Sequence, residues 1–194
     1  MITHIEGKLI EKTPTYAVID CGGVGYLLHI SLNTFSKLPV SGTCKIYSHL
    51  AIREDAHTLY GFVDQEERHL FRHLISVSGV GASTARMILS SLHPAEVHQA
   101  ILNGNVPLLQ SVKGIGAKSA QRIIVDLKDK LAKEGVISGI SLPLNNRIKD
   151  EALSALVMLG FAKNVAERAV DKVVKSEGDS LLVEQLIKLA LKNL

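Results

Sequence analysis

One thirteen-residue pattern occurs twice in this chain, 35 residues apart, and it constrains the fold more than any other feature. The first copy, residues 77–89, reads VSGVGASTARMIL, and the second, residues 112–124, reads VKGIGAKSAQRII. Six of the thirteen positions are identical, and each copy places a Gly-hydrophobic-Gly turn directly before a helix-forming run. Such a turn lets backbone N–H groups point outward at the positive end of the helix dipole. The repeat therefore predicts two tandem anion-binding sites.

The side chains after the two turns favour a polyanion with regularly spaced phosphates. The pattern is typical of the helix-hairpin-helix, in which hairpin amides bind DNA phosphates without reading sequence. Lys118 and Arg122 share one helix face after the second turn, whereas Ser83 offers only a hydroxyl after the first. The candidate DNA-binding residues are Gly79, Gly81, Ser83, Arg86, Gly114, Gly116, Lys118, Ser119 and Arg122.

Other interpretations of the glycine turns fit less well. Two ordinary helix connections are possible, but two matched copies make this the weaker alternative. A solenoid would need a third copy, and none is present. A P-loop requires Gly directly before the Lys, but Ala117 precedes Lys118. A Rossmann fingerprint requires a preceding strand, and both turns follow helical segments. We therefore expect no ATP site and no cofactor.

Three periodicities divide the chain into an expected α+β multidomain architecture. Residues 1–63 alternate as strands do, clearly so over 44–52, and predict an OB-fold-like β-barrel of five strands. Residues 64–133 have helical spacing and predict an all-α tandem helix-hairpin-helix domain. Glycines, a proline and two asparagines mark a linker at 134–146. Residues 147–194 predict a small C-terminal three-helix domain of the UBA-like type.

Charge and composition exclude some classes of protein. The 194 residues carry a formal net charge of +3, with six Lys/Arg against three Asp/Glu over 104–134, which a solvated helix face explains equally well. The two cysteines form no Cys-x-x-Cys pair, and no metal site is expected. No nucleophile–base pairing is apparent, so we expect no catalytic residue. No apolar run approaches 18 residues, and the chain is expected to be cytoplasmic with no membrane partner.

Two adjacent carboxylates, Glu54 and Asp55, lie at the expected tip of a hairpin between two strand-like runs. A solvated turn is the general explanation for such residues. The functional alternative is repulsive, because carboxylates held close to DNA would push phosphates apart at a point of strand separation. A metal-dependent nuclease is a third alternative, but it needs more acidic ligands than this stretch supplies.

A glycine ends the first predicted C-terminal helix, as expected of a helix cap. Small three-helix domains also use such a loop, with its apolar neighbours, to dock peptides. The candidate partner-binding residues are Leu156, Leu159, Gly160 and Phe161.

Together these motifs resemble the RuvA family of bacterial Holliday-junction-binding proteins over essentially the whole chain. The resemblance rests on MITHIEGKL at the start, GGVGY at 22–26, REDA at 53–56, LYGF at 59–62, the two Gly-x-Gly turns and ALVMLGF at 155–161. It implies a non-catalytic subunit of an ATP-dependent branch migration complex, acting in DNA recombination, repair and the SOS response. Ala82 and Ser83 depart from the Pro-Lys usual in the family's first hairpin.

The resemblance also implies an assembly. The family forms homotetramers, with an octamer possible on DNA, in which the barrels make a central platform and the hairpins contact the minor-groove sides of four arms. Glu54 and Asp55 match the family's central acidic pins. The C-terminal domain is implied to bind RuvB, a hexameric ATPase, and the RuvC resolvase is a further implied partner.

Two other functions stay open at this point. A helix-hairpin-helix DNA glycosylase or lyase is suggested by Lys118 beside a hairpin, although no base-sized pocket is apparent. A pure protein-interaction scaffold is suggested by the barrel and the C-terminal helices.

Overall fold

The computed structural model describes residues 2–139, 144–177 and 181–194. The chain forms two compact units, Met1–Lys133 and Glu134–Leu194. The first unit contains a barrel and the helices of both glycine turns, and the regular elements in the described part of the second unit are all helices.

The barrel is closed by five strands in the order β1-β2-β3-β5-β4. Their bounds are β1 (His4–Lys12), β2 (Tyr16–Cys21), β3 (Val24–Ile30), β4 (Gly42–Ile52) and β5 (His57–Phe62). All neighbouring strands are antiparallel except β3 and β5, which pair in parallel with Leu28 opposite Leu59. A short helix, α1 (Leu32–Lys37), connects β3 to β4. The predicted OB-fold-like barrel is confirmed.

Alternating apolar side chains fill the barrel, as the strand period requires. Ile19, Leu28 and Ile46 are fully buried in its core. Gly61 on β5 faces the same interior, where an added Cβ would lie 2.8 Å from Cγ2 of Ile46 and 3.0 Å from Cβ of Leu28. A larger residue at 61 would therefore force these side chains apart.

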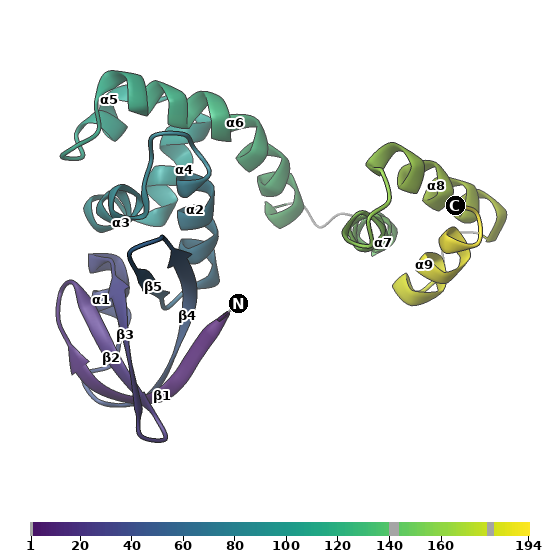
Figure 1. Ribbon diagram of the computed structural model, residues 1–194. Helices are drawn as coiled ribbons and strands as arrows, with labels where there is room; N and C mark the ends of the chain where they lie inside the picture. Colours follow the sequence, from purple (N-terminus) through teal and green to yellow (C-terminus); the bar gives the residue numbers. More distant parts are fainter. Residues whose placement is uncertain (1, 140–143, 178–180) are drawn as a thin grey trace. The chain divides into compact units, whose positions relative to one another are not determined.

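In the first unit, four helices and the part of a fifth up to Lys133 follow the barrel and pack at one end of it (Figure 1). They are α2 (Gln65–Ile75), α3 (Ala82–Ser91), α4 (Pro94–Leu102), α5 (Val106–Gln110) and α6 (Ala117–Gly139). Phe71 of α2 anchors them to the barrel, with its ring centroid 4.9 Å from that of Phe62 and 5.2 Å from that of Tyr60. Tyr60 and Phe62 of β5 therefore belong to the hydrophobic core of the helices, whereas the barrel interior forms a separate core.

A buried carboxylate forms the second connection between barrel and helices. Glu67 on α2 is fully buried and accepts hydrogen bonds from the hydroxyls of Ser31 and Thr34 and from the Asn33 amide. Its bonds to Asn33 and Thr34 are both 2.8 Å long. A buried charge is stable only when its lone pairs are satisfied, and these three donors at the start of α1 provide that.

The second unit contains α7 (Leu144–Met158), α8 (Lys163–Glu177) and α9 (Val183–Leu191), which confirms the three predicted helices. Its core is small, with Leu156, Val170 and Leu186 among the buried side chains. Each of the three helices packs against the other two.

The stretch expected to be a linker differs from that expectation in its described part. Helix α6 continues to Gly139 and α7 begins at Leu144, while residues 140–143 lie outside the described residues. The sequence DLKDKLAKEG favours helix, and a glycine in a helix costs only about 1 kcal/mol. The domain boundaries at 63, 133 and 146 stay predictions.

Candidate nucleic-acid interface

The two glycine turns have nearly the same backbone geometry. Gly79 and Gly114 adopt φ values of 89° and 91°, a left-handed conformation that favours glycine. The hydrophobic residues that follow, Val80 and Ile115, are buried with 5% and 7% of their surface exposed. Each donates its amide to the carbonyl three residues earlier, at 3.0 Å and 3.1 Å respectively. The repeated sequence therefore folds into a repeated structure.

Each turn leaves the first amides of its helix without an intrahelical partner. Gly81 caps α3 and Gly116 precedes α6, and neither has a side chain that could cap the helix. The first intrahelical bonds run from Ala85 to Gly81 at 2.9 Å and from Ala120 to Gly116 at 3.0 Å. The backbone amides therefore have no carbonyl acceptor within their own helix at residues 82–84 of the first hairpin and 117–119 of the second. Neither helix has an acidic residue in its first turn, so the positive helix ends are not neutralised there.

The side chains beside the amides differ between the two hairpins. Ser83 and Lys118 occupy the same position in the repeat, and both are exposed. Ser119 is half-buried, and Arg122 is exposed with its Nε 3.9 Å from Oδ2 of Asp126. Lys113 and Lys118 of the second hairpin therefore form no ion pair within the described chain, whereas the Arg122 charge is partly neutralised by Asp126.

Arg86 lies toward the barrel. Its Nη1 donates a 2.9 Å hydrogen bond to the carbonyl of Thr15, in the turn between β1 and β2. Arg86 also lines a cavity of about 240 Å³ between the barrel and α3, together with His29, Arg53 and Ser83. Burial and the Arg86 charge lower the pKa of His29 below its usual value of 6.5.

The two carboxylates of the predicted acidic pin lie in the turn between β4 and β5. Glu54 and Asp55 are both exposed, and the turn is closed by a 2.9 Å hydrogen bond from the Arg53 amide to the Ala56 carbonyl. Asp55 also lines the cavity beside α3. The acidic turn and the first hairpin are therefore neighbours, although 24 residues separate Asp55 from Gly79 in the chain.

The four residues expected to bind a partner differ in exposure. Leu159 is 62% exposed, and Gly160 ends the helix with a φ of 101°. Phe161 is half-buried. Leu156 differs from the expectation, because it is fully buried and packs in the core of the second unit. Its spacing on the inner face of α7 explains this placement.

Two further exposed apolar residues, which were not predicted from the sequence, lie directly before Leu159 in the second unit. Met158 is 89% exposed and Val157 is 41% exposed, directly before Leu159. The signal was present in the sequence, because three consecutive apolar residues cannot all face the core of one amphipathic helix. We call Val157, Met158 and Leu159 the apolar surface of the second unit.

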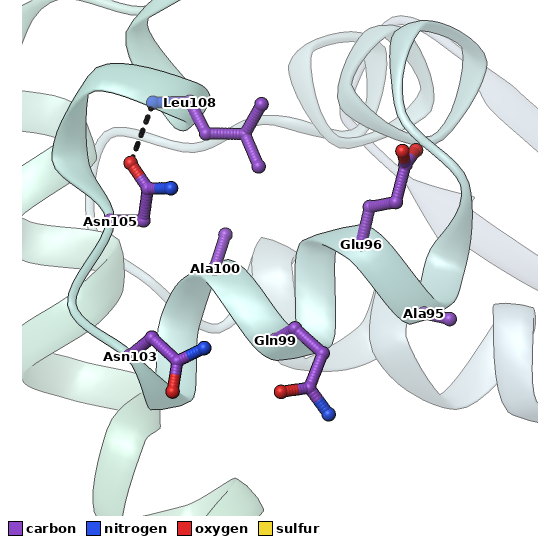
Figure 2. A pocket seen from close by; sticks show the side chains of 7 residues that line it. All are labelled: Ala95, Glu96, Gln99, Ala100, Asn103, Asn105 and Leu108. Atoms are coloured by element: carbon purple, nitrogen blue, oxygen red, sulfur yellow. Dashed lines mark hydrogen bonds between the residues drawn. The ribbon is translucent and has the colours of Figure 1, made fainter.

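A second cavity, of about 330 Å³, lies between α4 and α5 (Figure 2). Two of its polar side chains cap helices: Asn105 Oδ1 accepts a 3.1 Å bond from the Leu108 amide, and Glu96 accepts a 2.7 Å bond from the His93 amide. These groups stabilise the connection between the two hairpins, and we assign no ligand to this cavity.

His69 and His73, which were not among the predicted residues, lie one turn apart on α2, and their ring centroids are 4.5 Å apart. Their four-residue spacing was the available signal. Within the described ranges, no group of three or more His, Cys, Asp or Glu residues could hold a metal ion. Cys21 and Cys44 are free thiols and half-buried. No helix in the described part of the chain is long and apolar enough to cross a membrane.

The barrel and the matched turns define a tandem helix-hairpin-helix protein, and residues 71–129 match the family "SAM-like Helix-hairpin-helix tandem". Residues 1–61 match "RuvA N terminal domain", and residues 148–194 match "RuvA, C-terminal domain". The chain belongs to the RuvA family, as its motifs suggested.

Full-length relatives agree with this assignment. The chain is 54% identical over 194 residues to a protein of Christiangramia forsetii, and 52% identical over 194 residues to one of Flavobacterium psychrophilum. It is 51% identical over 202 residues to a protein of Bacteroides fragilis. In all three comparisons 100% of both chains is covered, and each relative is named Holliday junction branch migration complex subunit RuvA.

Proposed function

We propose that this chain is the Holliday-junction-binding subunit of a branch migration complex, acting in recombination and DNA repair in the bacterial cytoplasm. The observation that carries the proposal is the matched pair of glycine turns, with left-handed glycines at 79 and 114 and unpaired helix amides after them. The names of the full-length relatives support it.

The hairpins hold DNA through its backbone. Main-chain amides at the positive helix ends bind phosphate oxygens, and Lys118 adds a charge beside the second set. Phosphate contacts carry no base information, so a bound junction can slide along the protein as branch migration requires. The affinity falls steeply with salt, because each neutralised phosphate releases counterions.

The energy for migration comes from a partner. This subunit is non-catalytic, and the RuvB ATPase docks on the second unit at Leu159, Gly160 and Phe161, next to exposed Met158. By family resemblance, RuvC is a further partner.

Four copies around a junction explain how weak, sequence-independent hairpins recognise a four-way branch. A homotetramer presents eight hairpins to four arms, and an octamer doubles that number. The acidic turns with Glu54 and Asp55 meet near the centre, where they repel phosphates and keep the exchanging strands apart.

A binding titration tests the proposal. The full chain should bind a four-way junction much more tightly than a linear duplex of equal length, with an affinity that falls linearly on a log–log salt plot. Equal affinity for both DNAs contradicts the proposal. Native mass spectrometry with and without the junction reports whether four or eight copies assemble.

Deletion of residues 147–194 tests the role of the second unit. Junction binding should survive, because both hairpins lie in the first unit. Migration stimulated by the ATPase partner should be lost. Full stimulation of the truncated chain contradicts the docking role.

A further inference from the structure

Three basic side chains from two parts of the fold converge on the cavity between the barrel and α3. His29 comes from β3, Arg53 from the turn after β4, and Arg86 from α3. Asp55 is the only carboxylate among the residues that line this cavity. At about 30 Å³ per water in the liquid, a space of about 240 Å³ has room for a phosphate group.

The Arg53 guanidinium lies beside the first hairpin. Its Nη2 is 3.9 Å from the position that a Cβ on Gly81 would take, which places a cation at the positive end of α3. Among the described residues, no carboxylate forms an ion pair with Arg53 or Arg86, Asp55 included. Like charges at a helix end repel each other, so this arrangement is stabilised when an anion enters it.

Arg86 keeps donors for a ligand. One of its nitrogens, Nη1, bonds to Thr15, and a guanidinium has five N–H donors in all. The Ser83 hydroxyl lines the same cavity, in the position that Lys118 occupies in the second hairpin. Arg53 and Arg86 thus place positive charge beside the first hairpin, although Ser83, the residue that matches Lys118 in the repeat, has no charge.

We propose that Arg53, Arg86 and Ser83 form a composite site for one backbone phosphate of DNA, shared between the barrel and the first hairpin. The proposal rests on the proposed function and adds the barrel to the DNA-binding surface. The arginine of the barrel replaces the charge that Ser83 lacks. Because Asp55 borders the same cavity, the phosphate held there is next to the acidic turn, and the following phosphate of the strand is repelled by it.

A phosphate-specific experiment tests the site. A series of junctions is made in which a single phosphate of one strand is replaced by a neutral methylphosphonate, at successive positions from the crossover outward. Each junction is titrated with the full chain. Arg53→Gln is the main variant, because the Arg53 side chain makes no hydrogen bond or ion pair within the described structure. Arg168→Gln is the matched control, since Arg168 is exposed on α8 in the second unit.

One linkage near the crossover should weaken wild-type binding, by about tenfold for one charge-assisted contact. Arg53→Gln should weaken binding to the unmodified junction by more than this factor, because the variant removes the contact from all four subunits of the proposed tetramer. Binding by this variant should no longer depend on whether that one linkage is neutral. Arg86→Gln should act at the same linkage, and the double variant should be little weaker than either single variant, because both contact one phosphate. Arg168→Gln should bind as the wild type does.

The proposal is overturned if Arg53→Gln keeps wild-type affinity, or if no linkage position depends on Arg53. An absence of any Arg53-dependent linkage would also be found if the cavity bound a free phosphate ion instead of a DNA phosphate. Failure of the proposed function looks different, since the wild type would then show no preference for the junction. Thermal unfolding of Arg86→Gln separates a loss of the Thr15 contact from a loss of phosphate binding.

Discussion

The Thr34 hydroxyl donates a 2.8 Å hydrogen bond to the buried carboxylate of Glu67. Thr34 belongs to the short helix of the barrel, and Glu67 to the helix that leads into the first glycine turn. The contact therefore fixes the first hairpin against the barrel, and with it the acidic turn and Arg53.

Replacing Glu67 with alanine should lower the free energy of unfolding of the first unit by about 3 kcal/mol, because the buried Ser31 and Thr34 hydroxyls lose their acceptor. Urea unfolding followed by tyrosine fluorescence reports on this unit alone, since Tyr16, Tyr26, Tyr47 and Tyr60 are all the tyrosines of the chain. The exposed neighbour is the control, and Glu66→Ala should change the stability by less than about 0.5 kcal/mol. Equal effects of both variants contradict the structural role.

The two glycines of the second turn should separate stability from binding. Gly114→Ala places a side chain at a φ of 91° and should cost about 1–2 kcal/mol of stability. Gly116 has no such φ, and an added Cβ would meet nothing within 4 Å. Gly116→Ala should therefore fold normally but bind the junction more weakly, because its methyl group lies where a phosphate approaches the amides. Wild-type affinity of Gly116→Ala contradicts this close approach.

Neutralising the acidic turn should not weaken DNA binding. Glu54→Gln with Asp55→Asn removes two carboxylates from an exposed turn, so junction affinity should stay the same or rise, while strand opening at the crossover changes. Fluorescence of 2-aminopurine placed at the crossover reports the opening. A control of equal charge is Asp171→Asn with Glu184→Gln in the second unit, which should leave opening unchanged. Markedly weaker binding by the first variant argues against repulsion.

The first unit should lose stability in mild acid. Burial lowers the pKa of both His29 and His49 below 6.5, with Arg86 contributing at His29 and Arg72 and Arg68 at His49. Below pH 6.5 the unfolded chain binds protons that the folded chain does not, so the free energy of unfolding falls as the pH falls. Urea titrations between about pH 7.5 and 5.5 measure this slope, and His49→Gln should flatten it. If the free energy of unfolding of His49→Gln depends on pH as steeply as that of the wild type, His49 is not a source of the acid sensitivity.

Substitutions of two residues of α7 should separate the stability of the second unit from its binding of the partner. Leu156→Ala leaves a cavity in a small core and should destabilise the second unit by about 2–5 kcal/mol, seen as loss of helical circular dichroism on heating. Met158→Glu changes a residue that is 89% exposed and should leave the fold intact while it abolishes binding of the ATPase partner. Normal partner binding by Met158→Glu would exclude the apolar surface of the second unit as the docking site.

The features that could be predicted from the sequence are those with local causes. The left-handed glycines at 79 and 114 and the buried residues after them are set by a few neighbouring residues, and both turns were predicted correctly in position and type. The alternation over 44–52 likewise gave a strand, because it depends only on which face is buried.

Features that depend on distant parts of the chain were not predictable in this way. The Arg86 contact with Thr15 spans 71 residues, and the Arg53 guanidinium lies beside Gly81 of the first hairpin. Arg86 has no charged neighbour in the sequence that would indicate its direction, and the carboxylates next to Arg53, Glu54 and Asp55, form no ion pair with it in the described structure. The helix over 134–139 was missed for a different reason, because glycines were given more weight than the lysines and alanines before them.

The double anchoring of α2, through Phe71 and Glu67, has a mechanical consequence. If the hairpins hold DNA as proposed, a load on that DNA would pass through α2 into the closed barrel, because Phe71 and Glu67 join α2 to it. The hairpins and the barrel would then move as one body, so that the displacement would reach the point of strand exchange without bending between them.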